Sequence, residues 1–321
     1  MSKLRSIIAI LALLAAGPLA ATLIDSPLIF SLLAQSTIAG LFALSVGFLI
    51  RQNGMVSFGH AAFFGLPGYA IAVWIPAGAV PGELVIFGAI IFTTLFAFVI
   101  GLAIVRVHGI AFGMLTLALG QGLYQAAARL RGVTGGFDGI NLRHLPHDLF
   151  GLPVKLLQQP RSMLVVTWLI MALILTLVWL FSRSHWGRLT EAIRDNEERV
   201  RFLGYNTLIP RALIFAASAM IASIAGVLFI IYNAFISPDT LHWTASGEAL
   251  IMAILGGTGA PWGPVVGAFI YFFLKHEAGT YTTHWLSIIG CAVILISALF
   301  PSGLAGVIAR SIHLLRPRAN R

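Results

Sequence analysis

Charged residues are scarce in this chain of 321 residues. Asp, Glu, Lys and Arg make up only 10% of it, whereas 59% of the residues are hydrophobic. Soluble domains contain roughly 25% charged residues. A soluble protein this apolar would expose large hydrophobic patches, so the composition excludes an ordinary soluble domain and predicts a polytopic membrane protein. The net charge of +9 then reflects Lys and Arg that collect in cytoplasmic loops, rather than a nucleic-acid partner.

Cysteine and lysine are almost absent. The single cysteine, Cys291, lies in an apolar run, and one cysteine excludes a disulfide framework. The lysines are Lys3, Lys155 and Lys275, and none of them follows a glycine. A phosphate-binding P-loop contains a Gly-Lys pair. The chain therefore cannot be the usual ATP-hydrolysing subunit, and any ATP and Mg that drive it would be bound by a separate ATPase.

Residues that could hold a metal are also few. His144 and His147 are separated by Pro146, which argues against a pair of ligands on one helix face, and no third ligand lies nearby in the sequence. We therefore expect no metal and no cofactor on this chain.

Long apolar runs fill most of the sequence. A helix needs roughly 20 apolar residues to cross a bilayer. Candidate spans are 7–24, 28–50, 56–75, 84–105, 108–128, 163–181, 211–232 and 285–300. The apolar stretch 248–274 is interrupted by Gly and Pro at 256–264, which predicts two short helices, about 247–258 and 263–275. The predicted fold is an all-α membrane bundle of about ten (8–10) segments with broken helices.

The first run leaves an alternative open. Lys3 and Arg5 precede it and Gly-Pro-Leu-Ala-Ala follows, as in a cleavable signal peptide, but its length favours a retained helix. With ten segments both termini are cytoplasmic and most basic residues fall on that side, whereas nine segments would place the Arg-rich tail outside. We expect a single transmembrane domain over 1–310, with a cytoplasmic loop at 182–210, a periplasmic loop at 129–162 and a basic cytoplasmic tail at 311–321.

The one dense cluster of charges is the segment 183–210, which holds five Arg and four acidic residues. Such a segment cannot lie in hydrocarbon, because each charge there costs several kcal/mol. Leu189 and Ile193 begin a narrow apolar stripe, which predicts two short helices with a joint near Asp195–Asn196. Asp195 and Glu198 have the spacing of a capping box, and Gly204 suits a helix end. We interpret the segment as a docking element for another protein; the alternative is an ordinary charged loop.

Two glycine-rich segments interrupt the spans. In 53–69, Ser57 and His60 lie three residues apart near several glycines, which is typical of a broken helix that lines a cavity. A Ser–His nucleophile pair is the alternative, but the motif is G-x-x-S-x-G and no acidic residue lies nearby to orient the base. The second break, 256–268, lies in the other half of the chain, and paired breaks point to a transport pathway. The candidate pathway residues are Ser57, Phe58, Gly59, His60, Gly256, Gly257, Gly259, Trp262 and Gly263.

A third glycine-rich segment lies in the predicted outer loop. Thr134, Gly135 and Gly136 belong to RGVTGGFDGINL at 131–142, where the glycines predict tight turns. A functional contact and an ordinary surface loop are both open interpretations.

Together these stretches resemble the permease subunits of bacterial ABC importers for branched-chain amino acids, of the LivM type. The resemblance covers about residues 35–300, in family order. It rests on Gly54–Gly65, Thr134–Ile140, Arg194–Gly204 and Leu255–Pro264. Three features depart from the family pattern: Asn53-Gly54-Met55 where a Gly-Gln pair is common, Arg51 where a small residue is common, and a more charged stretch at Glu197–Arg201. They leave the solute and the ATPase partner open.

The resemblance implies a cytoplasmic coupling segment at 187–204 that sits in a cleft of an ATPase subunit. Its candidate coupling residues are Arg194, Asp195, Asn196, Glu197, Leu203 and Gly204. The implied partners are a second permease chain, two ATP-binding subunits and a periplasmic solute-binding protein, in a bacterial inner membrane.

We therefore expect a non-catalytic permease that moves a small polar solute inward by alternating access. The expected solute is a branched-chain or related amino acid, with urea, amides and aromatic acids left open. An autonomous secondary transporter or channel is the alternative. It would explain the broken helices but not the charged cytoplasmic segment, and a proton-coupled carrier would normally hold acidic residues within its spans.

Overall fold

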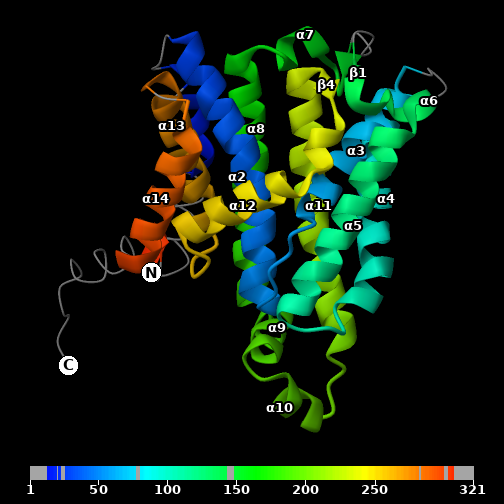
Figure 1. Ribbon diagram of the computed structural model, residues 1–321, viewed down its shortest axis with the longest axis vertical. Coiled ribbons are helices and arrows are strands. Elements are labelled where there is room, and N and C mark those ends of the chain that lie inside the picture. Colours follow the sequence, from blue (N-terminus) through cyan, green and yellow to red (C-terminus); the bar gives the residue numbers. More distant parts are fainter. Residues whose placement is uncertain are drawn as a thin grey trace.

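The computed structural model describes residues 13–19, 21–22, 26–76, 80–142, 148–281, 283–299 and 303–306. They form an elongated bundle of helices (Figure 1). Two long helices lie at its centre, α2 (Pro27–Asn53) and α11 (Leu208–Asn233), and they are buried along most of their length. Two others of spanning length, α4 (Gly82–Ile104) and α8 (Pro160–Arg183), pack around them and expose one apolar face. That pattern suits a protein whose outer surface meets lipid.

The structure thus confirms an all-α membrane bundle, with four described helices long and apolar enough to cross a bilayer. The other predicted spans coincide with helices that are shorter or more polar. These are α3 (His60–Trp74), α5 (Ile110–Arg129), α12 (Trp243–Gly256), α13 (Gly263–Tyr281) and α14 (Trp285–Leu299). Most of the first predicted span, 7–24, and the whole tail 311–321 lie outside the described residues. The prediction of ten spans therefore stays a prediction.

Both predicted breaks are present, but the helix that follows the first break begins later than expected. Residues 54–59 are not helical, and α3 starts at His60 rather than at 56. Gly54 has a φ of +66° and ends α2 in the left-handed conformation, which turns the chain away from the helix axis. Gly257 ends α12 with a φ of +90° and a ψ of 126°, which is a different backbone conformation, and α13 starts at Gly263.

The two ends of the bundle differ in character. At one end, short elements cover the helices: α6 (Arg131–Thr134), η1 (Gly136–Asp138), β1 (Ile140–Asn141), β2 (Asp148–Leu149), β3 (Leu152–Pro153), α7 (Val154–Leu157) and β4 (Phe235–Ile236). The short helix η2 (Pro238–Leu241) follows β4, packs against α3 and α5, and leads into α12. The strand β1 pairs antiparallel with β4, with Ile140 opposite Ile236, and β2 pairs with β3. At the opposite end, α9 (His185–Asp195) and α10 (Glu197–Phe202) project beyond the bundle (Figure 1).

Candidate functional site

The projecting end consists of two short helices, as the sequence predicts. The hydroxyl of Ser184 accepts a hydrogen bond from Gly187 N (3.1 Å) and caps α9. Asn196 joins the helices, and its side chain accepts from Arg199 N (2.9 Å) to cap α10. The predicted capping box of Asp195 and Glu198 is therefore wrong by one residue. Asn196, not Asp195, has the extended backbone that an N-cap requires, whereas Asp195 still closes α9.

The far end of α10 carries exposed apolar side chains. Phe202 is 90% exposed and Leu203 is 71% exposed. Gly204 follows with a φ of +87°, and its N–H donates to the carbonyl of Arg201 (2.9 Å), as expected for the residue that closes a helix. The tip of the segment thus presents an apolar surface next to arginine side chains.

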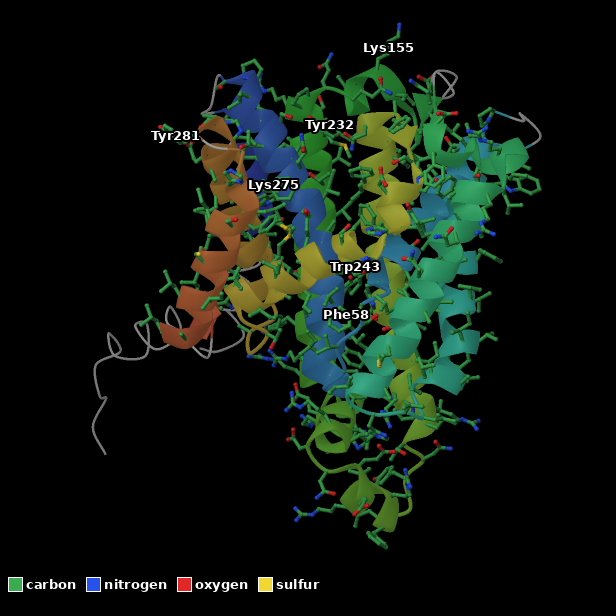
Figure 2. All side chains as sticks on the ribbon, viewed as in Figure 1. Phe58, Lys155, Tyr232, Trp243, Lys275 and Tyr281 are labelled. Carbon is green, nitrogen blue, oxygen red and sulfur yellow. The ribbon has the colours of Figure 1, made fainter. Side chains whose placement is uncertain are left out.

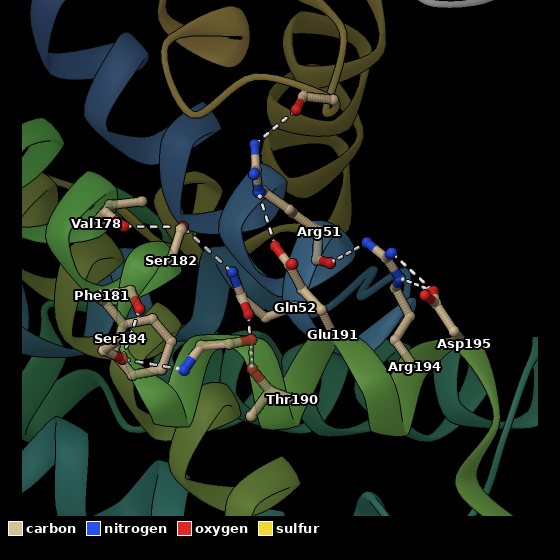
Figure 3. Close-up of polar contacts among 12 residues, drawn as sticks. Arg51, Gln52, Val178, Phe181, Ser182, Ser184, Thr190, Glu191, Arg194 and Asp195 are labelled. Carbon is tan, nitrogen blue, oxygen red and sulfur yellow. Dashed lines mark hydrogen bonds and ion pairs between the residues drawn. The ribbon is translucent and has the colours of Figure 1, made fainter. Parts of the chain in front are cut away.

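The C-terminal end of α2 fixes α9 to the bundle (Figure 3). Arg194 donates to the carbonyl of Arg51 (2.6 Å) and pairs with Asp195 (2.7 Å). Thr190 donates to the buried side chain of Gln52 (2.6 Å). Gly54 lies against Arg194, where a β-carbon would come within 2.9 Å of Cγ. The first broken segment therefore begins at the point where α9 is attached.

Arg51 extends this attachment to the second broken segment. Its guanidinium lies 3.5 Å from the Glu191 carboxylate on α9. The same guanidinium donates to the carbonyl of Gly259 (2.6 Å) in the turn between α12 and α13. One side chain thus joins α9 to a turn that lies 208 residues further along the chain than Arg51.

A second attachment is centred on Glu197 of α10. Its carboxylate accepts from Arg211 (2.7 Å), Arg201 (2.7 Å) and Thr207 (2.7 Å). Arg211, at the start of α11, is only 4% exposed, so this ion pair is largely removed from water. Partial burial raises the pKa of Glu197, but the bonds from Thr207 and His108, together with the two arginines, outweigh it and lower the pKa to about 2.

Two members of this cluster, Arg211 and His108, were missed by the sequence prediction. His108 Nε2 lies beside both Glu197 and Arg211. An arginine has only donors, so this nitrogen either accepts from Arg211 or, when it carries a proton, donates to Glu197; one nitrogen cannot do both at once. In the sequence, His108 and Arg211 each stand near the start of an apolar run without an adjacent charge. Spacing could not show that the turn before α5 would meet α10 and the start of α11.

The predicted pathway residues Ser57 and His60 are completely buried. The Ser57 hydroxyl and both His60 ring nitrogens form no hydrogen bond to the described residues, and the His60 ring packs edge-on against Phe63 and Phe215. A serine nucleophile requires a hydrogen bond to its base, so this geometry gives no support to a hydrolase.

The neighbouring Gly59 and Phe58 determine how the first break packs. Gly59 lies against the Thr116 carbonyl of α5 so closely that a β-carbon would overlap it. The N–H of Phe58 donates to the Thr116 hydroxyl (3.2 Å), and its ring is 37% exposed. Glycine is needed here because two backbones touch.

Close backbone contact also explains two glycines of the second break, Gly256 and Gly263, whereas Gly259 has open space beside it. A β-carbon on Gly256 would overlap the Gly263 carbonyl, and one on Gly263 would overlap the Gly257 carbonyl. Trp262 is partly buried and packs against the main apolar core. The two short helices can therefore pack closely at the turn only with glycine at these positions.

In the outer loop, Thr134 has a structural role. Its hydroxyl donates to the carbonyls of Ala127 (2.5 Å) and Leu130 (2.8 Å) at the end of α5. Gly135 and Gly136 both have positive φ, at 73° and 63°, which confirms the predicted tight turn.

Two hollows lie beside the broken segments. The inner hollow, of about 950 Å³, is formed by the 54–58 segment, α5 and Trp243 at the start of α12. Its lining is almost entirely apolar or glycine, apart from Gln121, whose buried Oε1 has no hydrogen-bond partner among the described residues. The outer hollow, of about 330 Å³, lies between α2, η2, α12 and α13. Trp243 lies at mid-height, between Phe58 below it and Lys275 above it (Figure 2).

Comparison with known proteins agrees with this architecture. Residues 28–299 match the family described as branched-chain amino acid transport system / permease component. The chain is 23% identical over 285 residues to the high-affinity branched-chain amino acid transport system permease protein LivM of Escherichia coli (strain K12), which covers 82% of this chain and 67% of that protein. It is 32% identical over 189 residues to the autoinducer 2 import system permease protein LsrC of Yersinia pestis (strain Pestoides F), covering 55% of this chain and 51% of that protein. No solved structure matches the chain.

The family match extends from the first residues of α2 to the end of α14 and so includes both broken segments and the projecting helices. Together with the apolar spans, it establishes that this chain is an integral membrane protein belonging to the family of branched-chain amino acid transport permease components.

Proposed function

We propose that this chain is a permease subunit of an ATP-driven importer, and that it moves a small polar solute inward by alternating access. The observation that carries the proposal is the projecting pair α9–α10. Polar contacts join it to the end of α2, where the first broken segment begins, and Arg51 of α2 extends this link to the turn of the second one. An element that ends in Phe202 and Leu203, flanked by arginines, suits insertion into a cleft of another protein.

ATP and Mg would be bound by two ATPase subunits, with a second permease chain and a periplasmic solute-binding protein completing the importer. In this arrangement α9 and α10 face the cytoplasm and the α6–α7 end faces the periplasm of a bacterial inner membrane. Residues 1–310 form a single transmembrane domain with about ten segments. No covalent chemistry is assigned to the chain.

Branched-chain amino acids are the solutes we propose first. The inner hollow is apolar and large enough for such a side chain, and a LivM protein is among the relatives. The LsrC relatives are named for import of a different small molecule, so another compact polar solute is the second candidate.

The test is affinity purification of the tagged chain from its native membrane, followed by reconstitution into vesicles and measurement of labelled leucine uptake. We expect a P-loop ATPase and a second permease to copurify, and uptake to require ATP and the binding protein. Uptake by this chain alone without ATP would indicate a self-sufficient carrier and overturn the proposal.

A further inference from the structure

The outer hollow differs in chemistry from the inner one. Its walls are aromatic and aliphatic, with Phe42, Phe64 and Phe229 among them, and its polar groups include two carboxylates, Asp239 and Glu248. An apolar cavity with a few converging polar groups is the usual form of a small-molecule site. The volume of about 330 Å³ is at the lower end of such sites and suits a compact ligand.

The charge balance of the outer hollow is negative. Glu248 pairs with Lys275 at 3.4 Å, and both side chains are about one-third exposed. Asp239 lines the same hollow from η2, and its carboxylate forms no hydrogen bond or ion pair with the described residues. Of the two carboxylates that line the hollow, Glu248 therefore has a lysine partner and Asp239 has none among the described residues. A cationic ligand would be attracted to this hollow, and an anionic one would be repelled.

The outer hollow also lies where an incoming solute would meet it. Gln35 lines it and donates to Ser31 (3.1 Å), which in turn contacts the hydroxyl of Tyr232 (3.1 Å). Tyr232 is close to the β4 end of the bundle (Figure 2). The inner hollow, in contrast, includes Gly54, which contacts Arg194 of α9. The helix α12 contributes Glu248 to one hollow and Trp243 to the other, so it separates them.

We infer that the outer hollow is a binding site for a protonated amine carried by a compact apolar body, with Asp239 and Glu248 around the ammonium group and the phenylalanine rings around the body. This inference rests on the proposed function and deepens it, since it assigns the site that holds the ammonium end of an amino acid before α12 moves. Neither carboxylate lies in the four segments on which the family resemblance rests.

The test uses the purified full-length chain in nanodiscs of zwitterionic phosphatidylcholine. The probes are two leucine analogues, each of which lacks one of the two charged groups of leucine. Isoamylamine keeps the ammonium and the branched body, and 4-methylpentanoate keeps the body and the carboxylate. Binding is measured by calorimetry for the wild type, Asp239→Asn and Glu248→Gln. Glu277→Gln is the matched control, because Glu277 lies on α13, is exposed and does not line the outer hollow.

We expect isoamylamine to bind the wild type and the control at least tenfold more tightly than 4-methylpentanoate, and each carboxylate variant to lose tenfold or more in affinity for the amine. Asp239→Asn removes no hydrogen bond or ion pair among the described residues, so it tests the inference even if Glu248→Gln does not fold. Thermal unfolding of each variant without ligand shows whether that variant is folded. Equal binding of both probes, or equal amine binding by all four proteins, would overturn the inference.

The binding measurement is independent of ATP and of the partner proteins. Absent amine binding with intact ATP-driven leucine uptake would overturn only the outer-hollow site. Intact amine binding with no ATP-driven uptake would count against the proposed function instead.

Discussion

At the scale of single residues, Glu197 is the most consequential side chain of the projecting end. It accepts hydrogen bonds from three side chains on α10, α11 and the intervening loop, and one of them, Arg211, is buried. A buried charge that loses its partner costs much more than the pair contributes when it is intact. The contact therefore fixes the position of α10 relative to α11.

Replacing Glu197 with Gln should lower the free energy of unfolding by roughly 3–5 kcal/mol, because Arg211 keeps a buried charge without a carboxylate. The adjacent Glu198 is exposed and forms no ion pair among the described residues, so Glu198→Gln should change stability by less than about 0.5 kcal/mol. Thermal unfolding of the two variants in one detergent checks this. Equal effects of the two substitutions would contradict the assigned role.

The pH dependence of the free energy of unfolding follows from the same Glu197 carboxylate. Its pKa is lowered from 4.5 to about 2, so the folded state favours the ionised form. The stabilisation is then complete above about pH 4.5 and is lost as the pH falls towards 2. The difference in stability between the wild type and Glu197→Gln should therefore be constant near neutral pH and shrink below pH 4.5. A difference that grows with acidity would show that the sign is wrong.

At the scale of elements, the close approach of α12 and α13 depends on glycine. A β-carbon on Gly267 would overlap the Met252 carbonyl, whereas one on Gly279 of the same helix would meet nothing within 4 Å. Helices in membranes use small residues at such contacts because close packing, rather than the hydrophobic effect, holds them together.

Alanine at these two positions should have opposite effects. Gly267→Ala should destabilise the protein by about 1–3 kcal/mol, since backbone atoms must move apart. Gly279→Ala should leave stability unchanged or raise it by up to about 1 kcal/mol, because alanine favours helix and has room. The pair can be compared by thermal unfolding, and loss of stability in Gly279→Ala alone would refute the packing argument.

Most elements could be predicted from the sequence, for physical reasons that also explain the errors. Apolar runs of spanning length indicated α2, α4, α8 and α11, and the Gly–Pro cluster indicated the α12–α13 turn. The start of α3 at His60 was missed because the apolar pattern continues through the non-helical residues 56–59. The cap at Asn196 was misplaced by one residue because Asp and Asn are equally good N-caps in sequence.

At the scale of the whole molecule, polar contacts connect elements that are far apart in the chain. Arg51 at the end of α2 contacts Glu191 on α9 and the Gly259 carbonyl in the α12–α13 turn. No spacing rule could predict this link, because it depends on how three elements meet. It provides a physical connection between the proposed ATPase-docking helices and the helix that separates the two hollows.

Within the proposed importer, Arg51→Gln should lower solute uptake several-fold more than it lowers ATP hydrolysis, since motion of α9 would no longer reach the α12–α13 turn. Arg106→Gln is the control, because Arg106 is exposed, lies in the turn after α4 and donates only to the Leu102 carbonyl of that helix among the described residues. Uptake and hydrolysis are measured in the same vesicles. A parallel fall in both rates would indicate that Arg51 serves only to hold the fold together.

In the proposed importer, α10 inserts into an ATPase subunit. A photocrosslinking amino acid placed at Phe202, which is 90% exposed at the tip, and irradiated in native membranes would report this contact. Val133, 59% exposed at the opposite end, is the control position. We expect position 202, and not position 133, to crosslink to a protein that contains a P-loop. Absence of that adduct at Phe202, or the same adduct at both positions, would contradict the proposal.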